Sequence, residues 1–431
     1  IMPDGLKMEV SLMEELDDIH GATGCIKEAQ DLAADLYGAD ESRFFINGTT
    51  GAIHAMLLTA LNPGDKVIVP RNAHRSVLGG LVLVGATPVF IQPEIDEKLG
   101  IAMSITPNEV QKVISENPEA KALVMVYPTY YGVAGDIKKI AQIVHENDMV
   151  LLVDEAHGPH LLVSDRLPMQ ALDAGADIVA QSTHKILGSM TQTSLLHMKK
   201  NRVDVERFNK MCSLVQSTSP NYLLMASLDT ARRQMAINGH ELVEKAVDLA
   251  EDLRCRINEI DGLYCFGREY MNSSGKFALD VTKLTVSVRE LGISGAQAEH
   301  ILRHKYKIQC ELSDFYNLLF IISYADGQYE CDYLYNALKS LAEEFIGKKQ
   351  KELVQIKLPS LPEYVLSPRE AMFKQTKKVE FKQSAGKIAG EMITFYPPGI
   401  PIIYPGEKIS KEIIDYVDLQ KNNGGNVIGP E

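Results

Sequence analysis

Residues 149–158 have the sequence MVLLVDEAHG, in which an apolar run ends abruptly at the acidic pair Asp154 and Glu155. A short, almost purely aliphatic run is typical of a strand buried on both faces of a parallel sheet. Amphipathic stretches of helical period, such as 26–36 and 137–146, alternate with such runs and predict an α/β fold with a mostly parallel sheet covered by helices. The other apolar runs lie at 43–46, 66–69, 88–91, 122–127, 177–180 and 194–197.

At 431 residues the chain is too long for one typical core, so we expect several domains. Residues 220–260 predict a long helix with a buried stripe that includes Leu228, Met235 and Ile237. The first residue is Ile1 rather than Met, so we expect further residues to precede it. The predicted parts are an N-terminal segment (1–20), a large domain (21–238), a small α/β domain (239–347) and a proline-rich C-terminal segment (348–431) with a strand near 400–404.

Composition argues against several partners. The formal net charge is −13, so the chain has no overall positive field to attract nucleic acid or anionic lipid. No uncharged stretch is long enough and free enough of glycine and proline to span a membrane. The six cysteines form no CxxC pair, which argues against a zinc site or any other metal site and fits a reducing compartment such as the cytoplasm.

Polar residues follow several predicted strands at the carboxyl ends, where ligands gather in parallel sheets. The sequence NGTTG at 47–51 precedes a helical run. Its free backbone N–H groups and the hydroxyls of Thr49 and Thr50 suit a phosphate, although an ordinary helix cap is an alternative. His74, in the sequence PRNAHRS, follows the strand at 66–69, where a structural histidine is the alternative.

Two further clusters carry charge. Asp154 ends a buried strand, which is costly unless the carboxylate meets a cation, a helix N-terminus or a local ion pair. Ser182, Thr183, His184 and Lys185 follow the strand at 177–180. Desolvation there would lower the pKa of the lysine and make its amine nucleophilic, whereas a lysine that extends into solvent is the alternative.

Taken together, these clusters provide the parts that pyridoxal 5′-phosphate needs: a phosphate site, a flat neighbour for the ring, an acid for the ring nitrogen and an amine for the aldehyde. The sequence VDEAH also occurs in nucleotide-dependent helicases, but those require an upstream GxxxxGK[ST] loop, which this chain lacks. An aminotransferase on the same scaffold stays open. It would need an arginine to hold the substrate carboxylate, and Arg289 is a candidate beside its structural explanation.

The chain resembles the Orn/Lys/Arg decarboxylases of the fold-type-I pyridoxal-phosphate enzymes, and most of all the shorter bacterial members, which are often arginine decarboxylases. The resemblance covers essentially the whole chain. It rests on FFINGTTGAIHA (44–55), VPRNAHRS (69–76), VYPTYYG (126–132), LLVDEAHG (151–158), QSTHKILGSMTQTSLLH (181–197), ELSDFYNLLFIIS (311–323) and EMITFYPPGIPIIYPGE (391–407).

The resemblance implies a role for each of these positions. Lys185 would bind the cofactor covalently, Asp154 would pair with the ring nitrogen, and His184 or Lys185 would return a proton to the substrate. His74 and Ala156 would lie on the two faces of the ring. Thr49, Thr50, Ser182 and His184 would hold the phosphate, and Thr129 would sit near the ring hydroxyl.

The resemblance also implies a seven-stranded large domain, a small α/β domain, a C-terminal α+β domain, and a homodimer or larger homo-oligomer with active sites shared between subunits. The substrate would be a basic amino acid. Arginine is favoured, lysine and ornithine stay open, and the amine could serve polyamine synthesis or acid consumption. Glu391 and Asp314 are candidates for gripping the distal cation. The PGHK-type motif usual near the N-terminus of the family is absent here, which we attribute to truncation or disorder rather than to loss.

Overall fold

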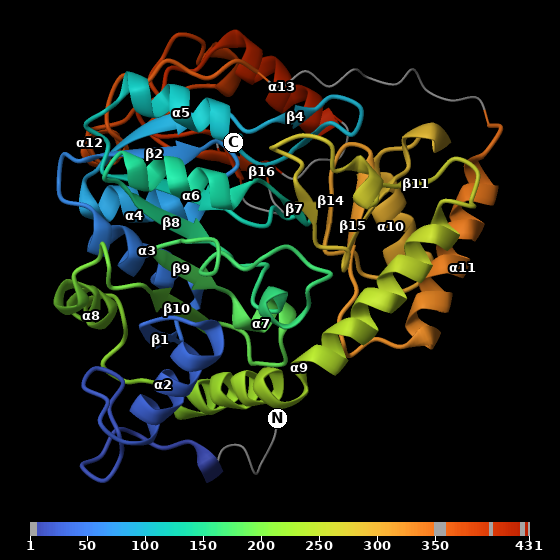
Figure 1. Cartoon of the computed structure of the whole chain (residues 1–431). Helices are drawn as coiled ribbons and strands as arrows, with labels where there is room; N and C mark the ends of the chain where they lie inside the picture. The colour runs from blue at the N-terminus through green and yellow to red at the C-terminus, as the bar shows by residue number, and fades with distance from the viewer. Residues whose placement is uncertain (1–6, 349–358, 396–399, 423–426, 430–431) are drawn as a thin grey trace.

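The computed structural model describes residues 7–348, 359–395, 400–422 and 427–429. Residues 396–399 of the YPPGIP motif therefore lie outside the described residues. Figure 1 shows a large domain around a central sheet, a smaller domain beside it, and a C-terminal part packed against the large domain. Separate apolar clusters form the cores of these parts, with two clusters in the large domain.

The large domain is built on a seven-stranded sheet, as predicted. The four pairings that join its five strands from β9 to β3 are parallel, and only β10 runs antiparallel to both of its neighbours. Each predicted run coincides with a strand to within two residues. In sheet order the strands are β1 (Glu41–Phe45), β10 (Ser194–Met198), β9 (Ile178–Gln181), β8 (Val150–Asp154), β6 (Ala122–Val126), β2 (Lys66–Pro70) and β3 (Thr87–Ile91).

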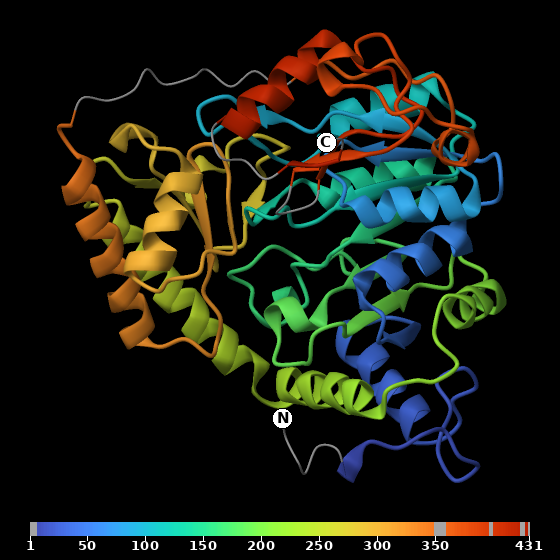
Figure 2. The ribbon, with the colours of Figure 1, turned by 180° about the vertical axis from the view of Figure 1, so that it is seen from behind.

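Helices cover both faces of this sheet, which explains why its strands are apolar throughout. Along β6, Leu123 and Met125 join one core cluster while Val124 joins the other, because successive side chains point to opposite faces. Helices α5 and α6 lie over one face and α3 and α4 over the other (Figures 1 and 2). The helices of this domain are α2 (Cys25–Tyr37), α3 (Gly48–Ala60), α4 (Arg75–Val84), α5 (Pro107–Glu116), α6 (Ile137–Glu146), α7 (Thr183–Ile186) and α8 (Val205–Leu214).

Helix α9 (Tyr222–Ile257) connects the large domain to the small one and contains the predicted boundary at residue 238. The expected stripe is only partly right: Leu228 and Met235 are buried, but Ile237 is 64% exposed. Here α9 bridges two domains, so one periodic face does not stay in contact with a single core. The domain boundaries themselves remain predictions.

The small domain is an antiparallel sheet packed against α10 (Gly295–Lys305) and α11 (Gln328–Phe345). A separate pairing of β12 (Ala278–Leu279) with β7 (Val133–Ala134) joins it to the large domain. In order, the sheet strands are β11 (Tyr264–Cys265), β13 (Lys283–Ser287), β15 (Asn317–Ile321) and β14 (Leu312–Ser313).

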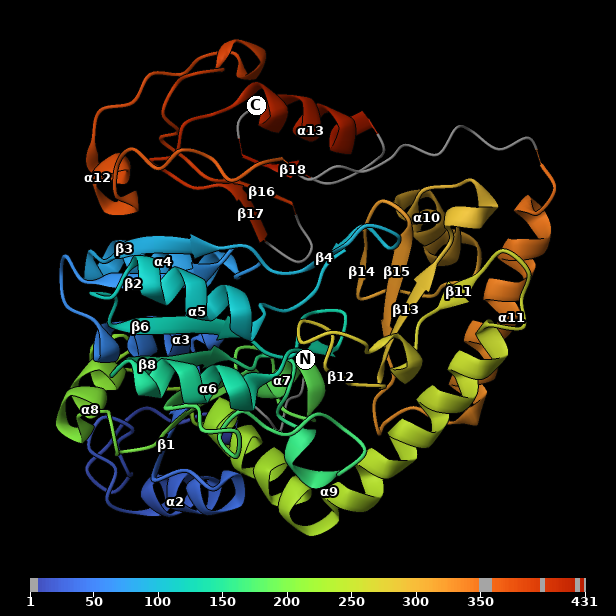
Figure 3. The same cartoon turned by 45° about the horizontal axis from the view of Figure 1, so that its top comes forward.

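The C-terminal part is α+β, as expected, and lies above the β2–β3 side of the large sheet (Figure 3). A short hairpin of β4 (Ile95–Asp96) and β5 (Ile101–Ala102) extends from the large domain toward the small one. In the described ranges, no helix is long and apolar enough to cross a membrane. The C-terminal elements are α12 (Pro368–Phe373), β16 (Ile393–Phe395), β17 (Ile400–Ile403), α13 (Lys411–Asn422) and β18 (Val427–Ile428).

Candidate active site

Lys185 lies on the short helix α7, which begins directly after β9 at the carboxyl edge of the sheet. Its Nζ atom is 3.2 Å from Nε2 of His157 and 3.5 Å from the hydroxyl of Tyr130. The side chain reaches solvent, yet enough protein surrounds the amine that desolvation lowers the pKa of Lys185, against the opposing charges of Asp154 and Glu311. A lowered pKa increases the uncharged, nucleophilic fraction of the amine.

Asp154 ends β8 and is buried, as the sequence predicts for a carboxylate at this edge. Its Oδ1 accepts a hydrogen bond of 3.2 Å from the backbone N–H of Ala156. Burial raises the pKa of Asp154, while the charge of Lys185 and this hydrogen bond oppose the rise. A buried carboxylate close to an amine is placed to pair with a protonated ring nitrogen.

The start of α3 has the features of a phosphate site. Asn47 precedes the helix but does not cap it, because its Nδ2 donates to the carbonyl of Val215 at 2.8 Å. Within the described part of the chain, Oγ1 of Thr49 is buried without a hydrogen-bond partner. An uncapped helix N-terminus and an orphaned hydroxyl fit an anion better than an ordinary N-cap.

The residues next to Lys185 offer further polar groups. Ser182 is fully buried, and its Oγ lies 3.4 Å from Nδ1 of His184. The carbonyl of Thr193, 2.9 Å away, accepts from the same ring nitrogen, which leaves Nε2 of His184 for a ligand. Oγ1 of Thr183 is also buried with no partner among the described residues; sequence reasoning placed Thr183 in the cluster with Lys185 but gave it no role. Thr50 is exposed on the same turn as Thr49.

His74 is the N-cap of α4, and its Nδ1 accepts from the backbone N–H of Ser76 at 3.2 Å. Burial lowers its pKa to about 4, and the charges of Lys185 and Arg75 add to this effect. The ring is therefore uncharged near neutral pH and can lie flat on an aromatic ligand. Ala156 is buried beside Asp154, and Thr129 is buried with its Oγ1 accepting from the backbone of Val133 at 3.2 Å.

Sequence reasoning did not assign roles to His157 and Tyr130, although both stand in the quoted motifs. Their rings are 4.4 Å apart, and both contact the amine of Lys185. Burial holds the pKa of His157 well below its usual range, with Lys185 contributing, so it faces the amine as an uncharged imidazole. Both residues are visible in the sequences DEAH and PTYY, but only the fold brings the strand ends that carry them close to Lys185.

Glu155 contradicts the nucleotide-dependent alternative. Its side chain is fully buried, and its two oxygens accept from the backbone N–H of Ala171 and from Nε2 of Gln181, both at 2.7 Å. A carboxylate that would hold magnesium or activate water must reach a ligand. Glu155 instead braces the ends of β8 and β9 from inside the domain.

The small domain forms the neighbouring wall through a buried charge cluster. Asp280 Oδ2 lies 3.1 Å from Lys283 Nζ and 3.2 Å from His160 Nε2. Burial alone would raise the pKa of Asp280, but Lys283 and His160 outweigh it and hold the carboxyl ionised. The charge of Lys283 also acts on Lys185 and His157, so the position of the small domain influences the site.

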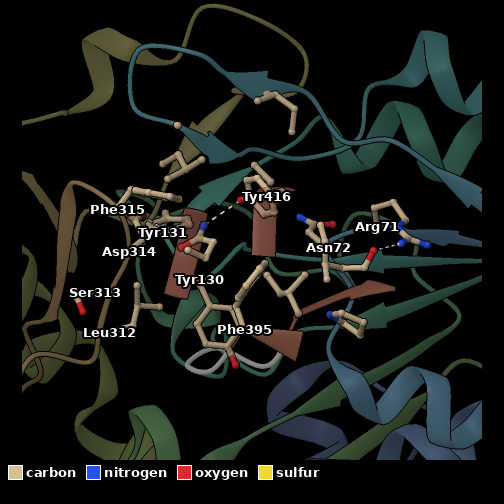
Figure 4. A pocket seen from close by; sticks show the side chains of 18 of the residues that line it. Arg71, Asn72, Tyr130, Tyr131, Leu312, Ser313, Asp314, Phe315, Phe395 and Tyr416 are labelled. Atoms are coloured by element: carbon tan, nitrogen blue, oxygen red, sulfur yellow. Dashed lines mark hydrogen bonds between the residues drawn. The ribbon is translucent and has the colours of Figure 1, made fainter. Parts of the chain in front are cut away.

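A cavity of about 400 Å³ opens where the three parts meet, and Tyr130, which contacts the amine of Lys185, is one of its lining residues. Asp314 lines it, but its carboxylate accepts hydrogen bonds from the Tyr131 hydroxyl and from the backbone and side chain of Asn317. Figure 4 shows Tyr130, Tyr131, Phe315, Phe395 and Tyr416 around this space. Glu391 is exposed and does not line the cavity.

Arg289, the candidate clamp of an aminotransferase, has a structural environment. Its Nη1 donates to the carbonyl of Lys98 at 2.9 Å, and its guanidinium lies 5.3 Å from the ring centroid of Tyr316.

Comparison with known proteins identifies this arrangement. Residues 3–330 match the family described as Orn/Lys/Arg decarboxylase, major domain, and residues 349–427 match its C-terminal domain. The chain belongs to the Orn/Lys/Arg decarboxylase family. It is an α/β carboxy-lyase of the fold-type-I class, which supports the predicted family and fold.

Relatives within the family cover nearly the whole chain. An arginine decarboxylase of Bacillus anthracis is 44% identical over 429 residues, spanning 99% of this chain and 87% of that protein. An arginine decarboxylase of Bacillus subtilis is 42% identical, spanning 99% and 88%. The crystal structure of a lysine decarboxylase of Francisella novicida has the same fold, with a TM-score of 0.83 at 24% identity, covering 97% of this chain and 72% of that one.

Proposed function

We propose that this chain removes the α-carboxylate of arginine as CO2, leaving the corresponding amine, with pyridoxal 5′-phosphate as cofactor. The observation that carries the proposal is the convergence of Lys185, Asp154 and the unpartnered hydroxyl of Thr49 at one edge of the sheet. Arginine is favoured over lysine because relatives named arginine decarboxylase are 42–45% identical, whereas a constitutive lysine decarboxylase of Escherichia coli is 25% identical.

The residues present fit this cofactor. The first turn of α3, Thr49, Thr183 and Nε2 of His184 would hold its phosphate. Lys185 would attach to its aldehyde through the uncharged amine. When bound, the cofactor supplies an electron-accepting ring, which stabilises the negative charge left at Cα when CO2 departs.

The chain's own residues would then direct the reaction. Asp154 would keep a proton on the ring nitrogen, because a buried carboxylate stabilises a nearby cation. The uncharged imidazole of His157 would hold the amine of Lys185 in place by accepting one of its hydrogens. Lys185 would then deliver a proton to Cα, since it is the amine at the reacting position.

We further propose Glu311 as a carboxylate that attracts the distal cation of the substrate. Its charge raises the pKa of Lys185, so its field reaches the reacting amine. It is exposed, and its side chain makes no hydrogen bond or ion pair within the described ranges. Asp314 is less suited to this role because its hydrogen bonds to Tyr131 and Asn317 occupy it.

Glu391 is exposed and does not line the cavity, so we propose that it acts at the site of another subunit. We propose a homodimer or larger homo-oligomer in which a second chain closes the site, as the resemblance implies. Sedimentation of the purified protein tests this, and a monomer would contradict it.

The decisive experiment is CO2 and amine release with pyridoxal phosphate, offering arginine, lysine and ornithine separately. Wild-type protein should release CO2 from arginine, and Lys185→Ala should release none. Turnover by Lys185→Ala would refute the mechanism, and a keto acid in place of an amine, formed once a keto-acid acceptor is added, would indicate an aminotransferase. Glu311→Gln should raise KM for arginine more than it lowers kcat.

A further inference from the structure

Two motifs of the sequence, VPRNAHRS and PGE, meet in space although they lie more than 300 residues apart. Nη1 of Arg71 donates to Oε1 of Glu407 at 2.6 Å, and Nη2 donates to Oε2 at 3.2 Å, so the ion pair is bidentate. The same Nη2 donates to the carbonyl of Ile402 at 2.8 Å. The Glu407 side chain is fully buried, and Arg71 is nearly so. The proposed reaction uses neither residue.

Arg71 packs between aromatic rings of the large domain and of the C-terminal part, so its side chain is held at the interface between the two. Its guanidinium carbon is 4.6 Å from the ring centroid of Phe90, on β3, and 4.8 Å from that of Tyr404, in the C-terminal part. Glu407 is itself oriented by the backbone N–H of Tyr404, which donates to its Oε2 at 2.7 Å. A buried, bidentate Arg–carboxylate pair has a well-defined geometry. Removing one partner is strongly destabilising, because it leaves the other charge buried and unpaired.

The turn that holds Arg71 leads directly to the candidate cofactor site. The N–H of Ala73 donates to the carbonyl of Pro70 at 3.0 Å and closes a four-residue turn with Arg71 inside it. The next residue is His74, the N-cap of α4, whose ring lies within electrostatic reach of Lys185. Any shift of the Arg71 side chain must move this turn or break the pair.

The geometry of PGE explains how Glu407 reaches inward. Gly406 has a φ of +93° and lies so close to the carbonyl of Leu366 that a Cβ would be 2.1 Å from its oxygen. Its own N–H donates to the carbonyl of Ala389 at 2.8 Å. The reversal at Gly406 therefore turns Glu407 toward the large domain.

We propose that the C-terminal domain completes the cofactor site through the Arg71–Glu407 pair, with Arg71 and Glu407 as positioning residues for His74. The domain is in this sense part of the active site rather than an appendage. The proposal rests on the proposed function, because it assigns His74 to the face of the cofactor ring.

The test measures affinity for pyridoxal phosphate, by titrating the cofactor-free full chain and following cofactor absorbance. Glu407→Gln, which keeps the shape but removes the charge, should weaken affinity about tenfold. Glu363→Gln is the matched control: it removes a carboxylate that pairs with Lys408 at 2.9 Å on the exposed surface of the same domain. Its affinity should equal that of the wild type.

A double-mutant cycle with His74→Ala separates positioning from general damage. If Glu407 acts through His74, the double variant should bind no more weakly than His74→Ala alone. Additive losses, or wild-type affinity in folded Glu407→Gln, would overturn the inference. Should Glu407→Gln fail to fold, Arg71→Lys enters the same cycle, since it keeps the charge pair but loses the second hydrogen bond to Glu407 and the one to Ile402.

The outcomes for the inference and for the proposed function can be told apart. Wild-type protein that does not bind pyridoxal phosphate would refute the proposed function. Wild-type protein that binds it, beside a Glu407→Gln variant that binds equally well, would refute the positioning role alone.

Discussion

Replacing Glu155 by Gln should remove a large pH dependence from the stability of the fold. Glu155 begins a buried chain of hydrogen bonds: Nε2 of Gln181 donates to it at 2.7 Å, and Oε1 of Gln181 is 3.1 Å from Nε2 of His197. Nδ1 of His197 is in turn 2.6 Å from the hydroxyl of Ser42. The four side chains are at most 1% exposed.

The magnitude follows from the burial of this carboxyl group. Desolvation raises the pKa of Glu155 to about 8, from an ordinary value of 4.5, despite the hydrogen bonds from Gln181 and Ala171. The folded state therefore binds the proton more tightly than the unfolded state. The stability that the bound proton contributes is complete below about pH 4.5 and is lost as the pH rises through about 8. A shift of this size corresponds to about 5 kcal/mol.

Glutamine can occupy the site without a charge. Its oxygen would accept from the N–H of Ala171, its Nε2 would donate to Gln181 Oε1, and Gln181 would reverse its amide to donate to the uncharged His197. Burial lowers the pKa of His197 to about 3, so it can accept. Every polar atom then keeps a partner, which avoids the cost of an unsatisfied buried group.

Urea unfolding of the cofactor-free protein, followed by circular dichroism from pH 5 to 9, measures the difference. The free energy of unfolding of Glu155→Gln should rise relative to wild type by several kcal/mol across this range. Glu259→Gln, at an exposed position, should follow the wild type throughout. Parallel curves for wild type and Glu155→Gln would show that Glu155 is not held protonated by burial, and the reasoning would fail.

Three further changes test other features of the structure. Gly406→Ala should cost about 3 kcal/mol of stability in urea unfolding, because the φ of Gly406 is +93° and a Cβ would overlap a backbone carbonyl. Gly386→Ala, at a φ of +78° with open space around it, should cost about 1 kcal/mol, and equal losses in the two variants would contradict the close approach at Gly406. Thr49→Val should raise the stability of the cofactor-free protein by about 1 kcal/mol, because it removes a buried hydroxyl without a hydrogen-bond partner, and it should weaken pyridoxal-phosphate binding about tenfold in a titration. A loss of stability would show that the hydroxyl of Thr49 has a partner in the cofactor-free protein. Asp154→Asn should lower the pKa of Lys185 further, because the charge of Asp154 raises it in the wild type. Reductive alkylation of Lys185 in the cofactor-free protein, measured against pH, should then have a lower midpoint, and a higher midpoint would exclude the electrostatic coupling.

The central sheet could be predicted from sequence because its strands are buried on both faces, which leaves an unbroken apolar signal. The acidic, basic and hydroxyl residues after these strands could be predicted for the same reason, since parallel strands bring their carboxyl ends to one edge. The stripe along α9 was wrong at Ile237, because a helix that spans two domains does not keep one face against one core.

Contacts between distant segments could not be predicted. His157 and Tyr130 face Lys185 from two other strand ends, and the charge of Glu311 acts on its pKa from the small domain. These distances depend on how strands and domains pack, which no local periodicity encodes.

The sequence by itself determined the order of strands and helices along the chain and the chemistry available at each strand end, because burial and backbone geometry act locally. Only the tertiary structure decided which carboxylates are engaged by hydrogen bonds within the protein and which are placed beside the reacting lysine. Glu155 and Asp314 are held by hydrogen bonds, Glu407 holds Arg71, and Asp154 lies near Lys185. The physical reason is that the pKa and the availability of a charge depend on its desolvation and its partners, and folding brings these from positions far apart in the sequence.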